Sequence, residues 1–225
     1  MKRTLFVIFI MNSLSGLSFA SNKSICLGSD QRFPSSDKKV GRVQRPGDKS
    51  GCTATLIGRS CVISAGHCQR RFQDVHFNVP SSTSEGKIVS SRVRDIYPVD
   101  KNSIRLKDEG KGNDFAVFRL QKNPVTGRLA GDVQGYYFVS FQKVLPGEFI
   151  RVVSFGADRD EGDEYRNYSQ QTSYSNIMEV SGERYMTYQA DTWGGSSGAP
   201  ILNKLNKLVG IHTHGDCEKE DGRNS

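Results

Sequence analysis

The chain has 225 residues, which is enough for one large domain or for two small ones that share a cleft. Its 23 glycines and 36% hydrophobic content favour an ordered, turn-rich β protein over a disordered one. The net charge of +7 is spread along the chain without a basic run interleaved with aromatic residues, which argues against a nucleic-acid partner.

Residues 1–20 have the pattern of a secretory signal peptide. Lys2 and Arg3 form a positive start, residues 5–11 form a short apolar core, and Ser18-Phe19-Ala20 offers a small-x-small cleavage site. The apolar core is too short to span a bilayer. We therefore expect a secreted protein, extracellular or periplasmic, with no membrane anchor after cleavage.

Residues 21–48 are polar and show no core periodicity, which predicts a propeptide or an extended N-terminal arm. From residue 49 onward, short β-branched and apolar runs alternate with turn residues, as in an all-β domain. The predicted strands are 53–57, 61–64, 75–79, 88–97, 115–120, 136–141, 149–155, 185–190, 199–202 and 207–211. Residues 121–135, with Asn-Pro and two glycines, are expected to cross between two halves.

Three separated motifs suggest nucleophilic chemistry. Ser197 lies in the run Gly-Gly-Ser-Ser-Gly-Ala-Pro at 194–200, a loop that can turn tightly and expose a hydroxyl beside backbone amides. His67 follows a short apolar strand in Ser-Ala-Gly-His-Cys, and Asp114 precedes another strand in Gly-Asn-Asp-Phe. A serine that attacks a carbonyl needs a base, a group that orients the base, and donors for the oxyanion.

With its motifs in the order His67, Asp114, Ser197, the chain resembles the trypsin/chymotrypsin-like serine endopeptidases, closest to their bacterial V8-like (glutamyl endopeptidase) branch. The resemblance spans residues 51–215. It implies two six-stranded-type antiparallel β-barrels, the first at about 49–122 and the second at about 136–225. Because members of the family continue with a further strand and a helix, we expect the second barrel to be truncated at the C-terminus.

The resemblance also implies the role of each residue. Ser197 is the expected nucleophile, His67 the general base and acid, and Asp114 the group that fixes the imidazole tautomer. The amides of Gly195 and Ser197 are expected to form the oxyanion hole. We expect glycine at 195 because a Cβ would crowd the substrate carbonyl.

The pocket for the P1 side chain (the S1 pocket) has two interpretations. In glutamyl endopeptidases a histidine in a Gly-Ile-His stretch and a threonine five positions before the serine hold a P1 glutamate, and His212 and Thr192 match both. An imidazolium and a hydroxyl are suitable donors for a carboxylate. Asp191 lies six residues before Ser197, where trypsin-like enzymes bind Lys or Arg. We favour an acidic P1 residue.

The chain has five cysteines, which fits an exported protein. The family's most widespread disulfide implies a Cys52–Cys68 bridge. Cys26, Cys61 and Cys217 stay unassigned, although Cys26 could belong to a removed propeptide. The cysteine pair that trypsins have near the S1 pocket cannot form, because Trp193 occupies one of its positions.

Two metal sites are conceivable, although we favour neither. His212, His214 and Cys217 lack a fourth ligand, and the acidic loop Asp158–Glu164 fits a solvated excursion better than a calcium site. We predict no cofactor and no metal.

The predicted function is that of a secreted, monomeric serine endopeptidase that acts on protein or peptide substrates and prefers Glu or Asp at P1. The alternatives are Lys or Arg specificity through Asp191, or a catalytically silent member of the fold that serves as a binding module.

Overall fold

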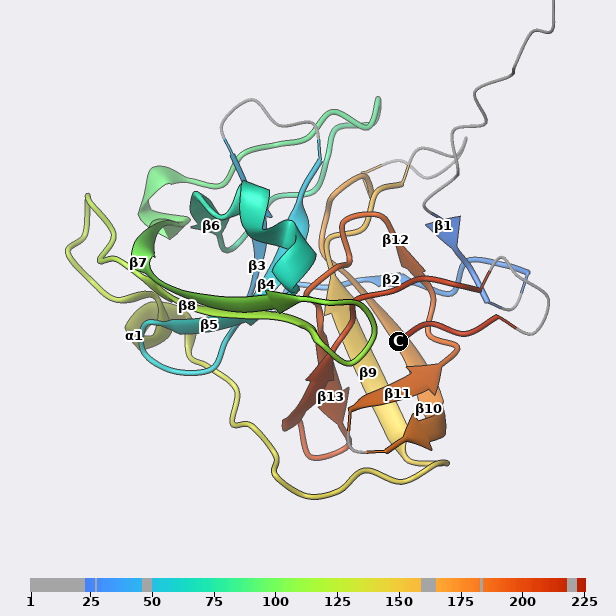
Figure 1. Cartoon of the computed structure of the whole chain (residues 1–225). Coiled ribbons are helices and arrows are strands. Elements are labelled where there is room, and N and C mark those ends of the chain that lie inside the picture. Colours follow the sequence, from blue (N-terminus) through green and yellow to red (C-terminus); the bar gives the residue numbers. More distant parts are fainter. Residues whose placement is uncertain (1–22, 27, 46–49, 159–164, 183, 218–221) are drawn as a thin grey trace, which may run out of the picture.

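The computed structural model describes residues 23–26, 28–45, 50–158, 165–182, 184–217 and 222–225. The predicted signal peptide and most of the acidic loop lie outside these residues. Strands dominate, and they gather into two bodies that lie side by side (Figure 1). The predicted all-β fold is confirmed. None of the helices in the described ranges has the length and apolar character needed to cross a membrane.

Six strands form a closed antiparallel barrel in the order β3-β4-β5-β8-β7-β6. Their bounds are Val40–Gln44 (β3), Cys52–Leu56 (β4), Cys61–Ser64 (β5), Asp74–His76 (β6), Ile96–Asp108 (β7) and Asp114–Leu120 (β8). Alternation of inward and outward side chains is clear on β8, where Ala116, Phe118 and Leu120 are buried. These side chains join Leu56 and Tyr97 in the core of the barrel.

The segment predicted to be a propeptide or arm is part of the fold. Strand β3 closes the first barrel by pairing with β4 and β6, so the barrel begins at Val40 and not near residue 49. Two shorter strands of the same segment, β1 (Lys23–Ser24) and β2 (Phe33–Pro34), pair with β12 and β10. The polar composition concealed these strands because they are short and lie at sheet edges.

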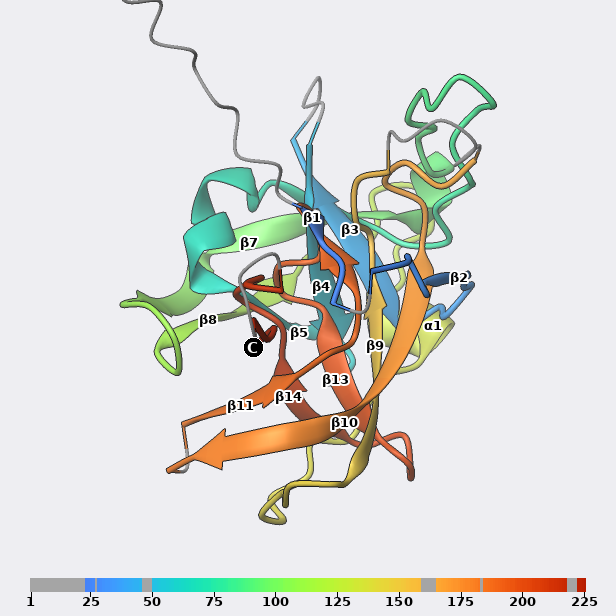
Figure 2. The same cartoon turned by 90° about the vertical axis from the view of Figure 1, so that its right-hand side faces the viewer.

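The second body is a sheet with the order β11-β10-β9-β13-β14, to which β2 adds through β10. The bounds are Phe149–Ser154 (β9), Gln171–Ser181 (β10), Tyr185–Tyr188 (β11), Pro200–Asn203 (β13) and Leu208–Ile211 (β14). In the part of the chain that the structure describes, β11 and β14 are the two ends of the path, so this sheet is open where the first is closed (Figure 2). Its core includes Ile150, Val152 and Ile201.

The remaining elements are short. They are the 3-10 helices η1 (Gly66–Arg71) and η2 (Val93–Asp95), the helix α1 (Ala130–Gln134) and strand β12 (Thr192–Trp193). The predicted crossing at 121–135 contains α1. Two predicted strands are wrong: residues 136–141 contribute only an isolated bridge from Val139 to Leu208, and residues 88–95 are irregular or 3-10 before β7 begins.

The first and last described segments meet beside the second sheet. Ser24 Oγ donates to Asn224 Oδ1 at 2.5 Å, and Asn224 pairs with Tyr188 of β11. A disulfide joins Cys26 to Cys217. The N-terminal arm is therefore covalently fixed to the segment that follows β14, and Cys26 is not part of a detachable propeptide.

Candidate active site

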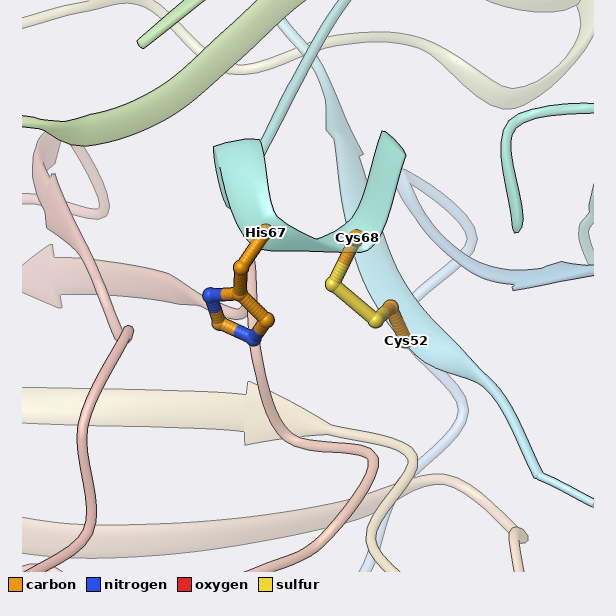
Figure 3. Close-up of side chains that lie close together, drawn as sticks. All are labelled: Cys52, His67 and Cys68. Atoms are coloured by element: carbon orange, nitrogen blue, oxygen red, sulfur yellow. A yellow bond between two sulfur atoms is a disulfide. The ribbon is translucent and has the colours of Figure 1, made fainter. Parts of the chain in front are cut away.

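His67 is presented by the short helix η1, directly after strand β5. Gly66 allows this turn to approach the first barrel, because a Cβ there would collide with the carbonyl oxygens of Lys107 and Phe115. The disulfide Cys52–Cys68 ties η1 to β4, as the family resemblance implied, and the imidazole lies beside it (Figure 3). The backbone of His67 is therefore held on one side by the close approach at Gly66 and on the other by the disulfide at Cys68, and its side chain is half-buried.

Asp114 begins strand β8 and is buried. Its Oδ2 lies 2.6 Å from Nδ1 of His67, and its Oδ1 accepts a hydrogen bond of 3.0 Å from the His67 backbone amide. Burial acts to raise the pKa of this carboxyl, but hydrogen bonds from the His67 ring and from the amides of His67 and Gly66 outweigh it and hold the pKa below its ordinary value. Asp114 is therefore ionised, and its carboxylate can only accept a hydrogen bond, so it favours the His67 tautomer that carries a proton on Nδ1.

Ser197 lies in the loop between β12 and β13. Its carbonyl oxygen accepts a hydrogen bond of 2.8 Å from the Thr53 amide and lies 4.0 Å from Sγ of Cys68, next to His67. Gly198 has φ +86°, and a Cβ there would collide with the Thr53 carbonyl oxygen. Among the described residues, no hydrogen bond joins Ser197 Oγ to His67. Such bonds are often long in free enzymes and shorten when substrate binds.

Thr53, on β4 of the first barrel, contacts the second sheet and this loop. Besides its amide bond to Ser197, its Oγ1 donates to the Gly195 carbonyl at 2.9 Å and accepts from the Phe155 amide at 3.1 Å. Sequence reasoning missed Thr53, because an isolated threonine in a strand carries no functional signal.

Gly195 has φ +111°, a conformation that favours glycine. A Cβ there would lie 2.5 Å from the Phe155 carbonyl oxygen and 2.7 Å from the Tyr168 ring. The packing of the protein itself therefore requires this glycine, which is a reason independent of the substrate. Within the described ranges, the amides of Gly195 and Ser197 donate to no other residue, and both are available to an oxyanion.

His212 follows β14 and is almost fully buried. Its Nδ1 lies 2.7 Å from the hydroxyl of Tyr188, a residue that the sequence did not single out. Burial, with smaller contributions from His214 and His67, lowers the pKa of His212 to about 3. In the free protein, burial therefore favours a neutral His212 ring over the expected imidazolium.

The two other predicted S1 residues lie on or next to β12. Thr192 is 1% exposed and pairs with Ser24 of β1. The carboxylate of Asp191 accepts hydrogen bonds of 2.7 Å from the amides of Cys26 and Gln31, one on each oxygen. Burial raises the pKa of Asp191 despite these bonds. A P1 Lys or Arg would have to compete with the N-terminal arm for both oxygens.

One of the two conceivable metal sites is contradicted by the structure, and the other falls almost entirely outside the described residues. The disulfide to Cys26 removes the Cys217 thiolate that a His212–His214–Cys217 site requires. The Cys52, His67 and Cys68 ligand atoms lie close together, but both sulfurs belong to a disulfide. In the acidic loop, Asp158 contacts Arg32 at 2.8 Å and Arg166 at 3.1 Å, so its partners are cations of the protein itself.

A cleft of about 430 Å³ lies beside Asp114, between β8, the β10–β11 hairpin and β14. Its lining includes Phe115, Arg184, Met186 and Thr213, but not Asp191, Thr192 or His212. The cleft is therefore separate from the predicted S1 residues.

The geometry and the strand arrangement together define a chymotrypsin-type fold with a His–Asp pair at the junction of two β bodies. Residues 27–224 match the model of the trypsin family. The chain belongs to the trypsin family, as the motifs indicated.

Among curated proteins, the chain is 24% identical to the glutamyl endopeptidase of Bacillus licheniformis over 180 residues, covering 73% of this chain and 51% of that protein. The chain thus spans about half the length of the curated relative it matches.

Solved structures with the same fold include a Glu endopeptidase in complex with MPD, with a TM-score of 0.66, 20% identity, and coverage of 89% of this chain and 91% of that chain. The thermostable serine protease AL20 from an extremophilic microorganism has a TM-score of 0.59 at 12% identity, covering 79% and 85% of the two chains. The protease Anisep from Arthrobacter nicotinovorans also has a TM-score of 0.59, at 14% identity, covering 86% and 90%.

Proposed function

We propose that this protein is a secreted, monomeric serine endopeptidase that cleaves proteins or peptides through Ser197, His67 and Asp114, and that it prefers Glu or Asp at P1. The observation that carries the proposal is the double contact of Asp114 with His67, at Nδ1 and at the backbone amide. This contact fixes both the orientation and the tautomer of the base.

The proposed reaction has two halves. Ser197 Oγ attacks the scissile carbonyl carbon while Nε2 of His67 takes its proton. The C–N bond then breaks, and His67 returns the proton to the leaving amine, which leaves an acyl-enzyme ester on Ser197. A water molecule attacks this ester with His67 again as base, releasing the acid and restoring the hydroxyl of Ser197.

The oxyanion of each tetrahedral intermediate would be bound by the amides of Gly195 and Ser197. Their freedom from other hydrogen bonds among the described residues supports this role. A single oxyanion donor is worth roughly 10² to 10³ in turnover in enzymes of this kind.

The preference for an acidic P1 side chain rests on His212 and Thr192 as donors. Both are buried, and both match the positions that the resemblance assigns to the S1 pocket. The relative from Bacillus licheniformis and the structural neighbour with a TM-score of 0.66 are both named as glutamyl endopeptidases. The hydrogen bonds of Asp191 to the N-terminal arm count against the trypsin-like alternative.

The test combines a fluorophosphonate probe with peptides that differ only at P1. The wild-type protein should label covalently and cleave after Glu, and Ser197→Ala should lose both activities. The matched control is Ser84→Ala, at an exposed serine that is distant from Ser197 in sequence, and this variant should keep both labelling and cleavage.

The other outcomes decide between the alternatives. Cleavage after Lys or Arg that vanishes in Ser197→Ala would keep the mechanism and overturn the acidic preference. A cooperatively folded protein that neither labels nor cleaves would overturn the proposal in favour of a silent binding module.

A further inference from the structure

Tyr188 forms a buried polar pair with His212, one of the residues proposed for the S1 pocket. The Tyr188 hydroxyl lies 2.7 Å from His212 Nδ1, and both side chains are at most 4% exposed. The two residues come from different elements, since Tyr188 ends β11 and His212 follows β14.

The backbone around this pair is held on both sides. Tyr188 exchanges two hydrogen bonds of 2.9 Å with the backbone of Asn224. The His212 amide donates to Ala199 at 2.8 Å, and its carbonyl oxygen accepts from Gly198 at 2.7 Å. His212 is thus tied to the two residues that follow the nucleophile, Ser197, in sequence.

The protonation states of the pair limit how the hydrogen bond can form. Burial raises the pKa of the Tyr188 hydroxyl well above its ordinary value and lowers the pKa of His212 to about 3, so both groups are neutral. A neutral imidazole carries one N–H and one acceptor nitrogen. In the described ranges, the charged groups that act on the pKa of His212 are His214 and His67, and Tyr188 is its hydrogen-bonding partner; none of these three is a carboxylate that would favour an imidazolium.

Two arrangements of protons are possible. In the first, the Tyr188 O–H donates to Nδ1, and the His212 proton lies on Nε2. In the second, Nδ1–H donates to the Tyr188 oxygen, which leaves the hydroxyl proton without an acceptor, because His212 is its only hydrogen-bonding partner among the described residues. A buried, unsatisfied donor costs roughly 1–3 kcal/mol, so the first arrangement is favoured.

We propose that Tyr188 is a positioning residue that holds His212 in the Nε2–H tautomer, so that a neutral N–H serves as the donor to a P1 carboxylate. This inference rests on the proposed function for the role of His212 in the S1 pocket. The tautomer itself is a property of the free protein, and it can be tested without substrate.

The first measurement is the ¹⁵N spectrum of the imidazole rings in the labelled protein. The chain has four histidines, and His212→Gln identifies the signals of His212. We expect a pure Nε2–H tautomer at neutral pH in the wild type and a mixture of tautomers in Tyr188→Phe. An imidazolium or an Nδ1–H tautomer of His212 in the wild type would overturn the inference.

The second measurement is the ratio of kcat/KM for P1 Glu to that for P1 Gln. The other tautomer would present a lone pair to the substrate, which repels a carboxylate but accepts a bond from an amide. Tyr188→Phe should therefore lower the Glu:Gln ratio, by about twofold when half of the rings carry the proton on Nδ1. Its rate of fluorophosphonate labelling should stay unchanged, because the triad is intact. Tyr185→Phe, on the same strand but partly exposed, should change neither quantity.

The third measurement is the pH dependence of the same ratio in the wild type. A neutral donor predicts a Glu:Gln ratio that is flat between about pH 6 and pH 9, whereas an imidazolium donor would lose its charge over this range. A ratio that falls with rising pH would overturn the inference. Labelling together with the Nε2–H tautomer but no preference for Glu would instead overturn the acidic P1 preference of the proposed function.

Discussion

Asp114 holds His67 through two different atoms of that residue, the ring nitrogen Nδ1 at 2.6 Å and the backbone nitrogen at 3.0 Å. One carboxylate therefore sets both the rotation of the imidazole and the position of the helix η1 that presents it. A substitution that removes the charge of Asp114 should change the orientation of the His67 ring more than the position of η1, because the disulfide Cys52–Cys68 also holds the backbone of η1.

Asp114→Asn should lower kcat about 10⁴-fold, because an amide can donate to Nδ1 and so favours the tautomer that cannot take the proton of Ser197. The melting temperature should change little by comparison. Asp108→Asn is the control, because Asp108 is the exposed β-pairing partner of Asp114. Peptide hydrolysis by the two purified variants measures the effect, and equal rates would remove Asp114 from the proposed mechanism.

Gly198→Ala should destabilise the protein far more than Gly147→Ala. Both glycines have φ +86°, so both substitutions carry the strain of a left-handed conformation, roughly 1–2 kcal/mol. Only Gly198 faces a neighbouring backbone, at the Thr53 carbonyl, whereas a Cβ at Gly147 meets open space. Urea unfolding gives the free energy of unfolding of each variant, and the difference between the two variants measures the cost of the contact with the Thr53 carbonyl. Equal losses would show that the nucleophile loop can move away from β4.

Removal of the Cys26–Cys217 disulfide by the double substitution Cys26→Ser, Cys217→Ser should lower the free energy of unfolding by up to about 5 kcal/mol, because the bridge closes a very long loop. The two cysteines are 191 residues apart in sequence. Cys61→Ser, at the free cysteine, is the control and should cost little. A double variant as stable as the wild type would mean that the hydrogen bonds of the N-terminal arm suffice to hold it.

Stability should fall as the pH is lowered below about 6.5, because three histidines, His76, His212 and His214, have depressed pKa values in the folded state. Burial lowers the pKa of His76 to about 4 and that of His212 to about 3. Below pH 6.5 the unfolded chain takes up protons that the folded chain refuses, so each group costs up to about 1.4 kcal/mol per pH unit until its folded pKa is reached.

Unfolding free energies measured between pH 7 and about pH 4 test this expectation. His76→Gln should make the profile less steep down to about pH 4, and the slope that remains comes from His212 and His214. An unchanged slope in that variant would show that His76 titrates normally in the folded protein.

The sequence predicted the proposed site from more distinctive signals than the fold around it. Ser197, His67 and Asp114 are short, distinctive motifs, and the apolar runs near 61–64, 115–120 and 149–155 became strands β5, β8 and β9. Strand β10 was missed because it is polar, and Thr172 and Ser173 are buried by virtue of tertiary packing. Ser173, for example, donates to the Asp191 carbonyl, a contact 18 residues away. No local pattern predicts such a partner.

The S1 pocket shows the same limit. Sequence position alone identified His212 as a histidine of interest, but its charge depends on burial and on Tyr188, which comes from another strand. Likewise, Asp191 has the residue type of a trypsin-like pocket. The hydrogen bonds to its carboxylate come from the N-terminal arm, in which the sequence indicated no regular structure.

Thr53 links the first barrel to the second sheet, and this link has a functional consequence. Its amide holds the backbone of Ser197, and its hydroxyl holds Gly195 and Phe155, all from the opposite half of the molecule. A residue of the first barrel thus helps to fix the conformation of a loop that belongs to the second sheet. In the proposed mechanism the nucleophile and its base come from different halves, so neither half alone would be active.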